Sequence, residues 1–174
     1  LDKTVAAGFF ASVPFGLAPD EFAGWINFGG GQELWDDLYG QFGVKPFLVG
    51  NTGIQMGGWF RKEIKATKDI KGLKLAVGGY AANVWEKLGG KVVNVPIGEI
   101  FGNLQSGALD GADWIGPYND VSLGLYKLTK NYYWPGALEP GCGIECLVNR
   151  RKYDALADDL KQIVSAACAA DDSV

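Results

Sequence analysis

The sequence contains no histidine among its 174 residues. Without an imidazole, the chain cannot form a Ser-His-Asp or Cys-His hydrolase or an HExxH metalloprotease, and it has no imidazole general base. No apolar run approaches the roughly 20 residues that a membrane-spanning helix needs, because Gly, Pro or a charged residue interrupts each run. These absences exclude much hydrolytic chemistry and predict a chain that does not itself span a membrane.

Cysteine is scarce, with single residues at positions 142, 146 and 168. Cys142 and Cys146 fall in a predicted strand, where four residues span about 13 Å. A disulfide needs Cα atoms within roughly 7 Å, so the spacing favours buried thiols outside any disulfide, Cys168 included. A bend at Gly141 and Gly143 is the alternative that would pair the first two. None of the spacings resembles a zinc site.

Positive charge is not in excess either, since the formal net charge is −4. The basic residues between Arg61 and Lys74 alternate with Glu63 and Asp69, as on a solvated surface around a turn, so nucleic acid is not the expected partner. What the chain does have is 48% apolar and 13% aromatic content, enough for a packed core. Its opening, LDKTVAAGFF, has neither an initiator Met nor a basic signal start, which predicts a processed or truncated N-terminus.

Hydrophobic periodicity predicts alternating helices and strands, and therefore an α/β fold. Helices are expected from Pro19, around 34–42, 81–88 and 97–108, over the aromatic stretch 121–134, and as one closing helix over 153–167. Strands are expected at 44–49, 73–77, 91–95, 112–115 and 144–148. The segment 54–60, rich in glycine and aromatic residues, is predicted to be extended.

Two stretches match a known family in order and spacing. They are GWFRKEIKATKDIKGLKLAV (58–77) and KLGGKVVNVPIGEIFGNLQSGALDGADWIGPYND (87–120), supported by VPFGL at 13–17, the EPG turn at 139–141 and LVNRRKYDAL at 147–156. Together they resemble the solute-binding proteins of TRAP-type transporters, and in particular the branch that binds 2-oxo acids. No single motif would suffice, but about half of the chain carries the resemblance.

The resemblance implies a two-lobed periplasmic-binding-protein fold of the type II kind, here incomplete at both ends. It implies a first lobe and interlobe strand over 1–58, a second lobe over 59–116, and a return to the first lobe over 117–174. A family member is a periplasmic receptor that closes on a small organic anion and delivers it to a membrane permease. Such a receptor binds its ligand without catalysing a reaction.

The resemblance also implies a site, carried over residue by residue. Gln55 matches a glutamine that contacts ligand and cation, and Asp113-Trp114 match an acidic-aromatic pair that helps to hold a cation bridging to the ligand carboxylate. Carboxylate, amide and carbonyl oxygens suit sodium or calcium. We expect further pocket or cation-site residues at four positions. They are Phe15, Trp59 and Tyr118 for the ligand, and Glu139 for the cation.

One position departs from the family pattern. An arginine that grips the ligand carboxylate bidentately is expected in the strand after Gly-Leu-Lys, but the sequence has Ala76 there. Such an anchor contributes about 1.5 to 3 kcal/mol. Three explanations stay open: a cation at Asp113 supplies the positive charge, the ligand is different or neutral, or binding is weak.

Two other functions compete with transport. The same module could sense a ligand for a partner chain, and the sequence does not distinguish this from delivery to a permease. An enzyme could use Asp113 or Glu145 as an acid-base group. No motif in the sequence places the second carboxylate that such an enzyme would need.

Overall fold

The structure is a computed structural model that describes residues 4–172. It groups into two compact units, one from the described parts of Leu1–Ser12, Leu17–Thr52 and Gly141–Val174, and one from Val13–Gly16 and Gly53–Pro140. The second unit thus extends to Pro140 and includes residues 117–140. The lobe division at 58 and 116 stays a prediction about the whole two-lobed protein. The predicted processed or truncated N-terminus falls on residues 1–3, which lie outside the described residues.

The first unit is built on a two-stranded antiparallel sheet of β1 (Val44–Asn51) and β7 (Gly143–Asn149). The expected strands at 44–49 and 144–148 are therefore confirmed. Successive side chains of a strand point to opposite faces. Leu48 packs with the core residues Phe10, Phe22, Ile26 and Trp35, which come from η1 (Val5–Phe10), α1 (Pro19–Phe28) and α2 (Gly31–Gly40).

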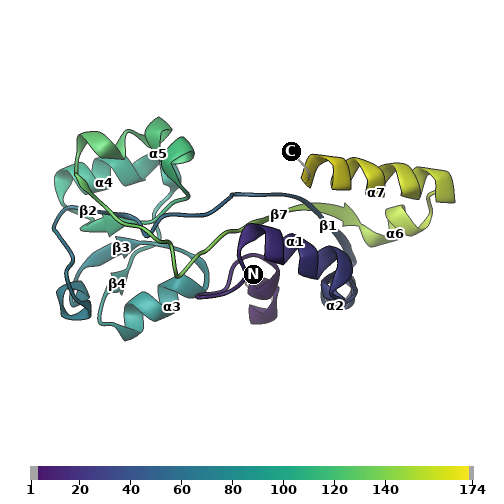
Figure 1. Cartoon of the computed structure of the whole chain (residues 1–174), viewed down its shortest axis with the longest axis horizontal. Coiled ribbons are helices and arrows are strands. Elements are labelled where there is room, and N and C mark those ends of the chain that lie inside the picture. Colours follow the sequence, from purple (N-terminus) through teal and green to yellow (C-terminus); the bar gives the residue numbers. More distant parts are fainter. Residues whose placement is uncertain (1–3, 173–174) are drawn as a thin grey trace. The chain divides into compact units, whose positions relative to one another are not determined.

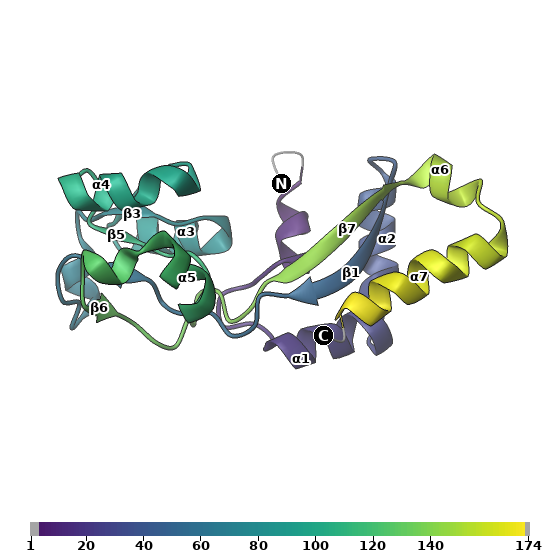
Figure 2. The ribbon, with the colours of Figure 1, turned by 90° about the horizontal axis from the view of Figure 1, so that it is seen from above.

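The next residue of β1, Phe47, faces the other side. Its ring contacts Tyr153 of α6 (Arg150–Asp154) at 5.4 Å between centroids. The last helix, α7 (Asp158–Asp172), runs alongside β1 in Figures 1 and 2. The β1–β7 sheet is therefore covered on one face by α1 and α2 and on the other by α6 and α7.

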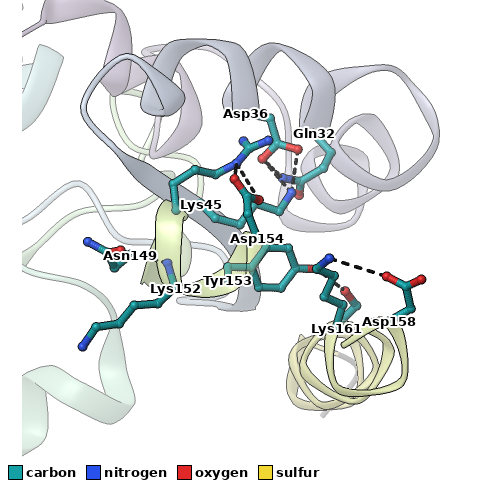
Figure 3. A network of polar contacts seen from close by, with 11 residues as sticks. Gln32, Asp36, Lys45, Asn149, Lys152, Tyr153, Asp154, Asp158 and Lys161 are labelled. Atoms are coloured by element: carbon teal, nitrogen blue, oxygen red, sulfur yellow. Dashed lines mark hydrogen bonds and ion pairs between the residues drawn. The ribbon is translucent and has the colours of Figure 1, made fainter. Parts of the chain in front are cut away.

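Polar contacts fasten α2 to the first strand. Lys45 of β1 places its Nζ 2.7 and 2.5 Å from the two carboxylate oxygens of Asp36, and the Gln32 amide donates to Asp36 at 3.1 Å (Figure 3). Helix α1 begins at Pro19, and Glu21 accepts a hydrogen bond from the Ala18 N–H at 2.9 Å. These contacts fix α2 to β1 and fix the start of α1.

The second unit holds a five-stranded sheet in the order β4-β3-β5-β2-β6. Strand β3 is parallel to β4 and β5, and β2 is antiparallel to β5 and β6. The strands are short, and helices and 3₁₀ turns connect them. The elements are β2 (Trp59–Phe60), η2 (Thr67–Ile70), β3 (Lys74–Ala76), α3 (Gly79–Lys87), β4 (Lys91–Val92), η3 (Ile97–Glu99), α4 (Ile100–Ser106), β5 (Gly111–Ala112), α5 (Pro117–Leu123), η4 (Leu125–Lys127) and β6 (Asn131–Tyr132).

Two predicted helices were wrong in extent. The stretch 121–134 forms the end of α5, η4 and β6, because Gly124 adopts φ 69° and ends α5, and residues 131–132 pair with β2. The closing helix is divided into α6 and α7. Tyr153 packs on Phe47 at the end of α6, and a new helix starts at Asp158 with acidic residues in its first turn.

A buried carboxylate organises the second unit. Asp120, 1% exposed, accepts hydrogen bonds from Trp59 Nε1 at 2.9 Å, the Tyr132 hydroxyl at 2.7 Å and the Ile115 N–H at 3.3 Å. The rings of Trp59 and Tyr132 stack at 3.8 Å between centroids. Burial, and then the hydrogen bond to Asp120, raise the pKa of Tyr132, so its hydroxyl stays a donor. Asp120 therefore joins α5 to β2 and β6.

Replacing Asp120 with alanine should destabilise this unit strongly. The change strands the Trp59 indole N–H and the Tyr132 hydroxyl in a buried site, which costs about 2–3 kcal/mol. In a thermal melt the midpoint should fall by roughly 5–10 °C. Asp37→Ala, at an exposed position of α2, is the control and should change it little. Equal midpoints for the two variants would show that the network contributes no stability.

Candidate ligand and cation site

The candidate site lies at the carboxyl ends of two parallel strands of the second unit. Strand β3 ends at Ala76 and β5 ends at Ala112, which are paired in the sheet. Ala112 is followed by Asp113, whose N–H donates to the Ala76 carbonyl at 3.0 Å. Ligands of open α/β sheets bind outside the carboxyl ends of parallel strands. The fold therefore places the Asp113 carboxylate where this class of fold binds its ligands.

Asp113 is held in surroundings that disfavour its charge. Desolvation, followed by repulsion from Glu139 and Asp120, raises the pKa of Asp113 to about 8, and a hydrogen bond from the Trp114 backbone opposes the shift. Burial raises the pKa of Glu139 to about 7. Two partly buried carboxyl groups thus lie close enough to repel each other. Such a pair is stabilised by a bound cation or by protons.

The turn at 136–139 brings Glu139 to this place. The Gly136 N–H donates to the Gln55 carbonyl at 3.1 Å, and a Cβ at Gly136 would lie 2.5 Å from that oxygen. Only glycine permits so close an approach. Glu139 ends the turn with its Oε1 3.3 Å from the position of a Cβ on Gly79, the first residue of α3. Gln55, Glu139 and the loop after β3 are thereby held together.

Asp113 borders an aromatic cavity of about 290 Å³. Phe15 belongs to its wall and holds a left-handed backbone, φ 57°, while its N–H donates to the Ala137 carbonyl at 2.7 Å. A non-glycine residue in this conformation is uncommon and marks functional or strained sites. The lining residues are Phe15, Gly57, Phe60, Ile64, Trp85, Asp113, Tyr133, Trp134, Pro135, Gly136, Ala137 and Leu138.

A second cavity, of about 400 Å³, opens on the other side of Asp113. Its wall is mostly aliphatic, and Ala76 and Trp114 belong to it. The lining residues are Ala76, Val77, Gly78, Val92, Val93, Asn94, Val95, Ile97, Ile100, Asp113 and Trp114. Asp113 is the one charged residue in the walls of these two cavities, and neither wall contains Lys or Arg. An anion entering either cavity meets no basic side chain of these walls.

The structure brings together most of the residues expected at the site. Asp113, Trp114 and Phe15 line the cavities, and Glu139 lies beside Asp113. Gln55 is 2% exposed and adjoins the turn before Glu139.

Two expected ligand contacts lie elsewhere. Trp59 is in the core, stacked on Tyr132, and lines neither cavity. Tyr118 is 92% exposed on α5. Their roles as ligand contacts stay predictions, and the surroundings of Trp59 indicate a structural task.

The aromatic wall formed by Tyr133 and Trp134 was not predicted from the sequence. The signal was present, since YYWP at 132–135 lies three residues before the EPG turn that supplies Glu139. Assigning a helix to residue 134 concealed it. An extended chain after β6 is what carries these rings to the cavity.

The donors fit a hard cation, although no carboxylate cluster is preformed. Within residues 4–172, no three acidic or cysteine side chains are close enough to form a metal site. The expected donor set is mixed, with the Asp113 carboxylate, the Gln55 amide oxygen and the Trp114 backbone carbonyl. Oxygen donors of these kinds are the ligands of calcium and sodium. Glu139 adds a second carboxylate at the edge of the set.

The cation-free protein should lose stability as pH rises. The folded pKa values of Asp113 and Glu139, about 8 and 7, exceed the ordinary values 3.8 and 4.5, so the folded state binds more protons between them. The stability that these two groups contribute is therefore fully present below about pH 4 and is lost as the pH passes through 7 to 8. In a chelator, melts from pH 5.5 to 8.5 should show a falling midpoint, undisturbed by histidine, which the sequence lacks.

Asp113→Asn is the matched variant for this experiment, because it keeps the shape and removes the charge. Its midpoint should vary less with pH than that of the wild type. A wild-type midpoint that rises over the same range, with Asp113→Asn parallel to it, would show that Asp113 ionises normally.

None of the helices in the described part of the chain has the length and apolar character to cross a membrane. A family model, "Bacterial extracellular solute-binding protein, family 7", matches residues 2–173. A monocarboxylate 2-oxoacid-binding periplasmic protein of a Nostoc species is 42% identical over 167 residues, 96% of this chain and 46% of that protein.

Two solved structures are similar over the whole described chain. The TRAP periplasmic solute-binding protein of Pseudoalteromonas atlantica, with sodium and pyruvate bound, has a TM-score of 0.91 at 40% identity, covering 98% of this chain and 52% of that one. The corresponding protein of Colwellia psychrerythraea, with calcium and pyruvate bound, has a TM-score of 0.93 at 40% identity and the same coverage. The chain spans about half the length of these relatives. The fold and the sequence together confirm the expected resemblance: the chain belongs to family 7 of the bacterial extracellular solute-binding proteins, the binding proteins of TRAP transporters.

Proposed function

We propose that the protein captures a small organic acid, of the 2-oxo acid class, together with a sodium or calcium ion. The observation that carries the proposal is the Asp113 carboxylate, desolvated between two cavities at the carboxyl end of β5. Relatives at 40% identity hold pyruvate with sodium or calcium. We place the protein in the periplasm, where family members deliver their ligand to a membrane permease.

The cation supplies the positive charge that the walls of the cavities lack. Asp113, Gln55 and the Trp114 carbonyl would hold it, with Glu139 beside them. Without the cation, Asp113 repels a carboxylate ligand or keeps its proton. With the cation, a ligand carboxylate oxygen would contact a metal ion and would no longer face the uncompensated charge of Asp113, which is why we favour a cation over a neutral ligand or weak binding as the explanation for Ala76.

The relatives favour binding over catalysis. Neighbouring carboxyl groups with raised pKa values, such as Asp113 and Glu139, suit a cation site as well as acid-base chemistry, and the relatives with this fold are solute-binding proteins. Glu145 belongs to the first unit, where it interacts with Tyr39. We therefore propose a receptor without catalytic activity, and turnover of a bound 2-oxo acid would contradict this.

Binding of pyruvate should depend on the cation. Calorimetric titration of the longest natural form of the protein should show pyruvate binding in calcium or sodium. In chelator with an organic counter-ion, the affinity for pyruvate should be at least roughly tenfold weaker. Asp113→Ala should abolish the difference, because the carboxylate that holds the cation is gone. Glu86→Gln, at an exposed position of α3, is the control and should behave as wild type. Equal pyruvate affinity with and without cation would contradict the proposed site.

Restoring the arginine should tighten binding. Ala76→Arg places a guanidinium in the wall of the aliphatic cavity, and a charge-assisted pair contributes about 1.5 to 3 kcal/mol. Monocarboxylate affinity should rise roughly 10- to 100-fold, and the demand for cation should weaken. Ala76→Gln adds comparable bulk without charge and should give no gain. If both variants fold and bind alike, position 76 does not face the ligand.

A further inference from the structure

Two of the three cysteines lie on β7 and on α7, the helix that packs against β1, the partner strand of β7. Cys146 is in the middle of β7, and Cys168 is in the last turns of α7. All three cysteines are thiols in this structure. The site described above uses none of them, since it belongs entirely to the second unit.

The sheet register determines the direction of Cys146. Cys146 pairs with Phe47, and Glu145 pairs with Leu48. Directly paired residues share a face, so Cys146 shares the face on which Phe47 meets Tyr153 of α6. The neighbouring pair confirms the alternation, because Glu145 interacts with Tyr39 of α2 on the opposite face. Cys146 therefore points to the side of the sheet that α6 and α7 cover.

Cys168 approaches from the helix. It is 9% exposed, whereas most of α7 is exposed, so it lies on the side of the helix that packs against β1. It shares the wall of a shallow cavity with Val49 of β1. Burial, followed by the nearby Cys146 thiol, raises the pKa of the Cys168 thiol. The strand register and the burial of Cys168 place both side chains between the sheet and the helices that cover this face.

We propose that Cys146 and Cys168 form a disulfide that fastens α7 to β7. The oxidant is a disulfide-bearing compound, as found in the oxidising compartments where disulfides persist. The thiolate of Cys146, the more exposed of the two, attacks a sulfur of the oxidant and expels one thiol. The thiolate of Cys168 then attacks the mixed disulfide at Cys146 and expels the second thiol. Two protein thiols are oxidised, and one disulfide is reduced to two thiols.

The packing of α7 gives this bond a purpose. Apolar side chains of the helix stay accessible, with Leu160 45% and Ile163 61% exposed. The helix contributes little apolar burial for its length, so a covalent link adds a constraint that packing does not supply. Closing a loop of roughly 20 residues reduces the conformational entropy of the unfolded chain, and the melting temperature should rise by about 5–10 °C.

Cys142 is a built-in control. It precedes β7, where its N–H donates to Thr52 Oγ1 at 2.9 Å. Four residues of nearly extended chain, about 13 Å, separate it from Cys146, beyond the span of a disulfide. The alternative pairing of Cys142 with Cys146 is therefore absent from the structure, and Cys142 should keep its thiol under conditions that oxidise the other two.

The test is oxidation of the full natural chain with glutathione disulfide at pH 8, followed by alkylation and mass spectrometry. We expect one linked peptide pair that contains Cys146 and Cys168. Its mass should be about 2 Da, two hydrogens, below the summed masses of the two reduced peptides. Cys142→Ser should oxidise like wild type, and Cys146→Ser and Cys168→Ser should not. The oxidised protein should melt higher, and reductant should reverse the shift.

Three results would overturn the proposal. The first is that both thiols stay alkylatable in the folded protein at high oxidant concentration. The second is a linked peptide that contains Cys142, or a link between two copies of the chain. The third is a correct link without any rise in melting temperature, which would show that the bond does not fasten α7.

Discussion

The second unit of this protein is defined by one electrostatic constraint, a carboxylate held away from water with no basic side chain in the cavity walls beside it. Asp113 follows the short strand β5, and its backbone is fixed to the end of β3 by a hydrogen bond. Both neighbouring cavities share it, and the nearby Glu139 adds negative charge. A buried negative site of this kind is stabilised by a proton or a metal cation. The charges of the chain itself thus support the proposed cation at Asp113.

A second aspartate of the same unit lies in different surroundings. Asp120, by contrast, is fully satisfied by an indole N–H, a tyrosine hydroxyl and a backbone N–H, and it joins α5 to the sheet. Two aspartates seven residues apart, Asp120 buried and Asp113 partly buried, therefore have different tasks. Asp120 is stabilised by hydrogen bonds within the protein. Asp113 is desolvated beside Glu139, and a bound cation would stabilise its charge.

Much of the architecture could be predicted from the sequence, because apolar runs such as 44–49 and amphipathic spacing in 81–88 specify strand and helix directly. The family motif identified Asp113 and Trp114 as site residues inside a predicted strand over 112–115, whereas β5 ends at Ala112 and both residues follow it. The aromatic wall of the site was missed, because residues 131–134 have helical spacing and only pairing with β2 makes them extended. The role of Trp59 as a ligand contact stays a prediction, and its hydrogen bond to Asp120 is a tertiary contact that no local pattern reveals. Long-range pairing and burial, not local propensity, decided these cases.

The most direct test of the central claim is a crystal structure of the full-length protein grown with calcium and pyruvate, with the cation located by anomalous scattering. The account predicts a cation 2.3–2.6 Å, roughly the calcium–oxygen distance, from Asp113 and Gln55 oxygens and from the ligand carboxylate. Pyruvate bound without a cation at Asp113, or a cation bound away from Asp113, would contradict it.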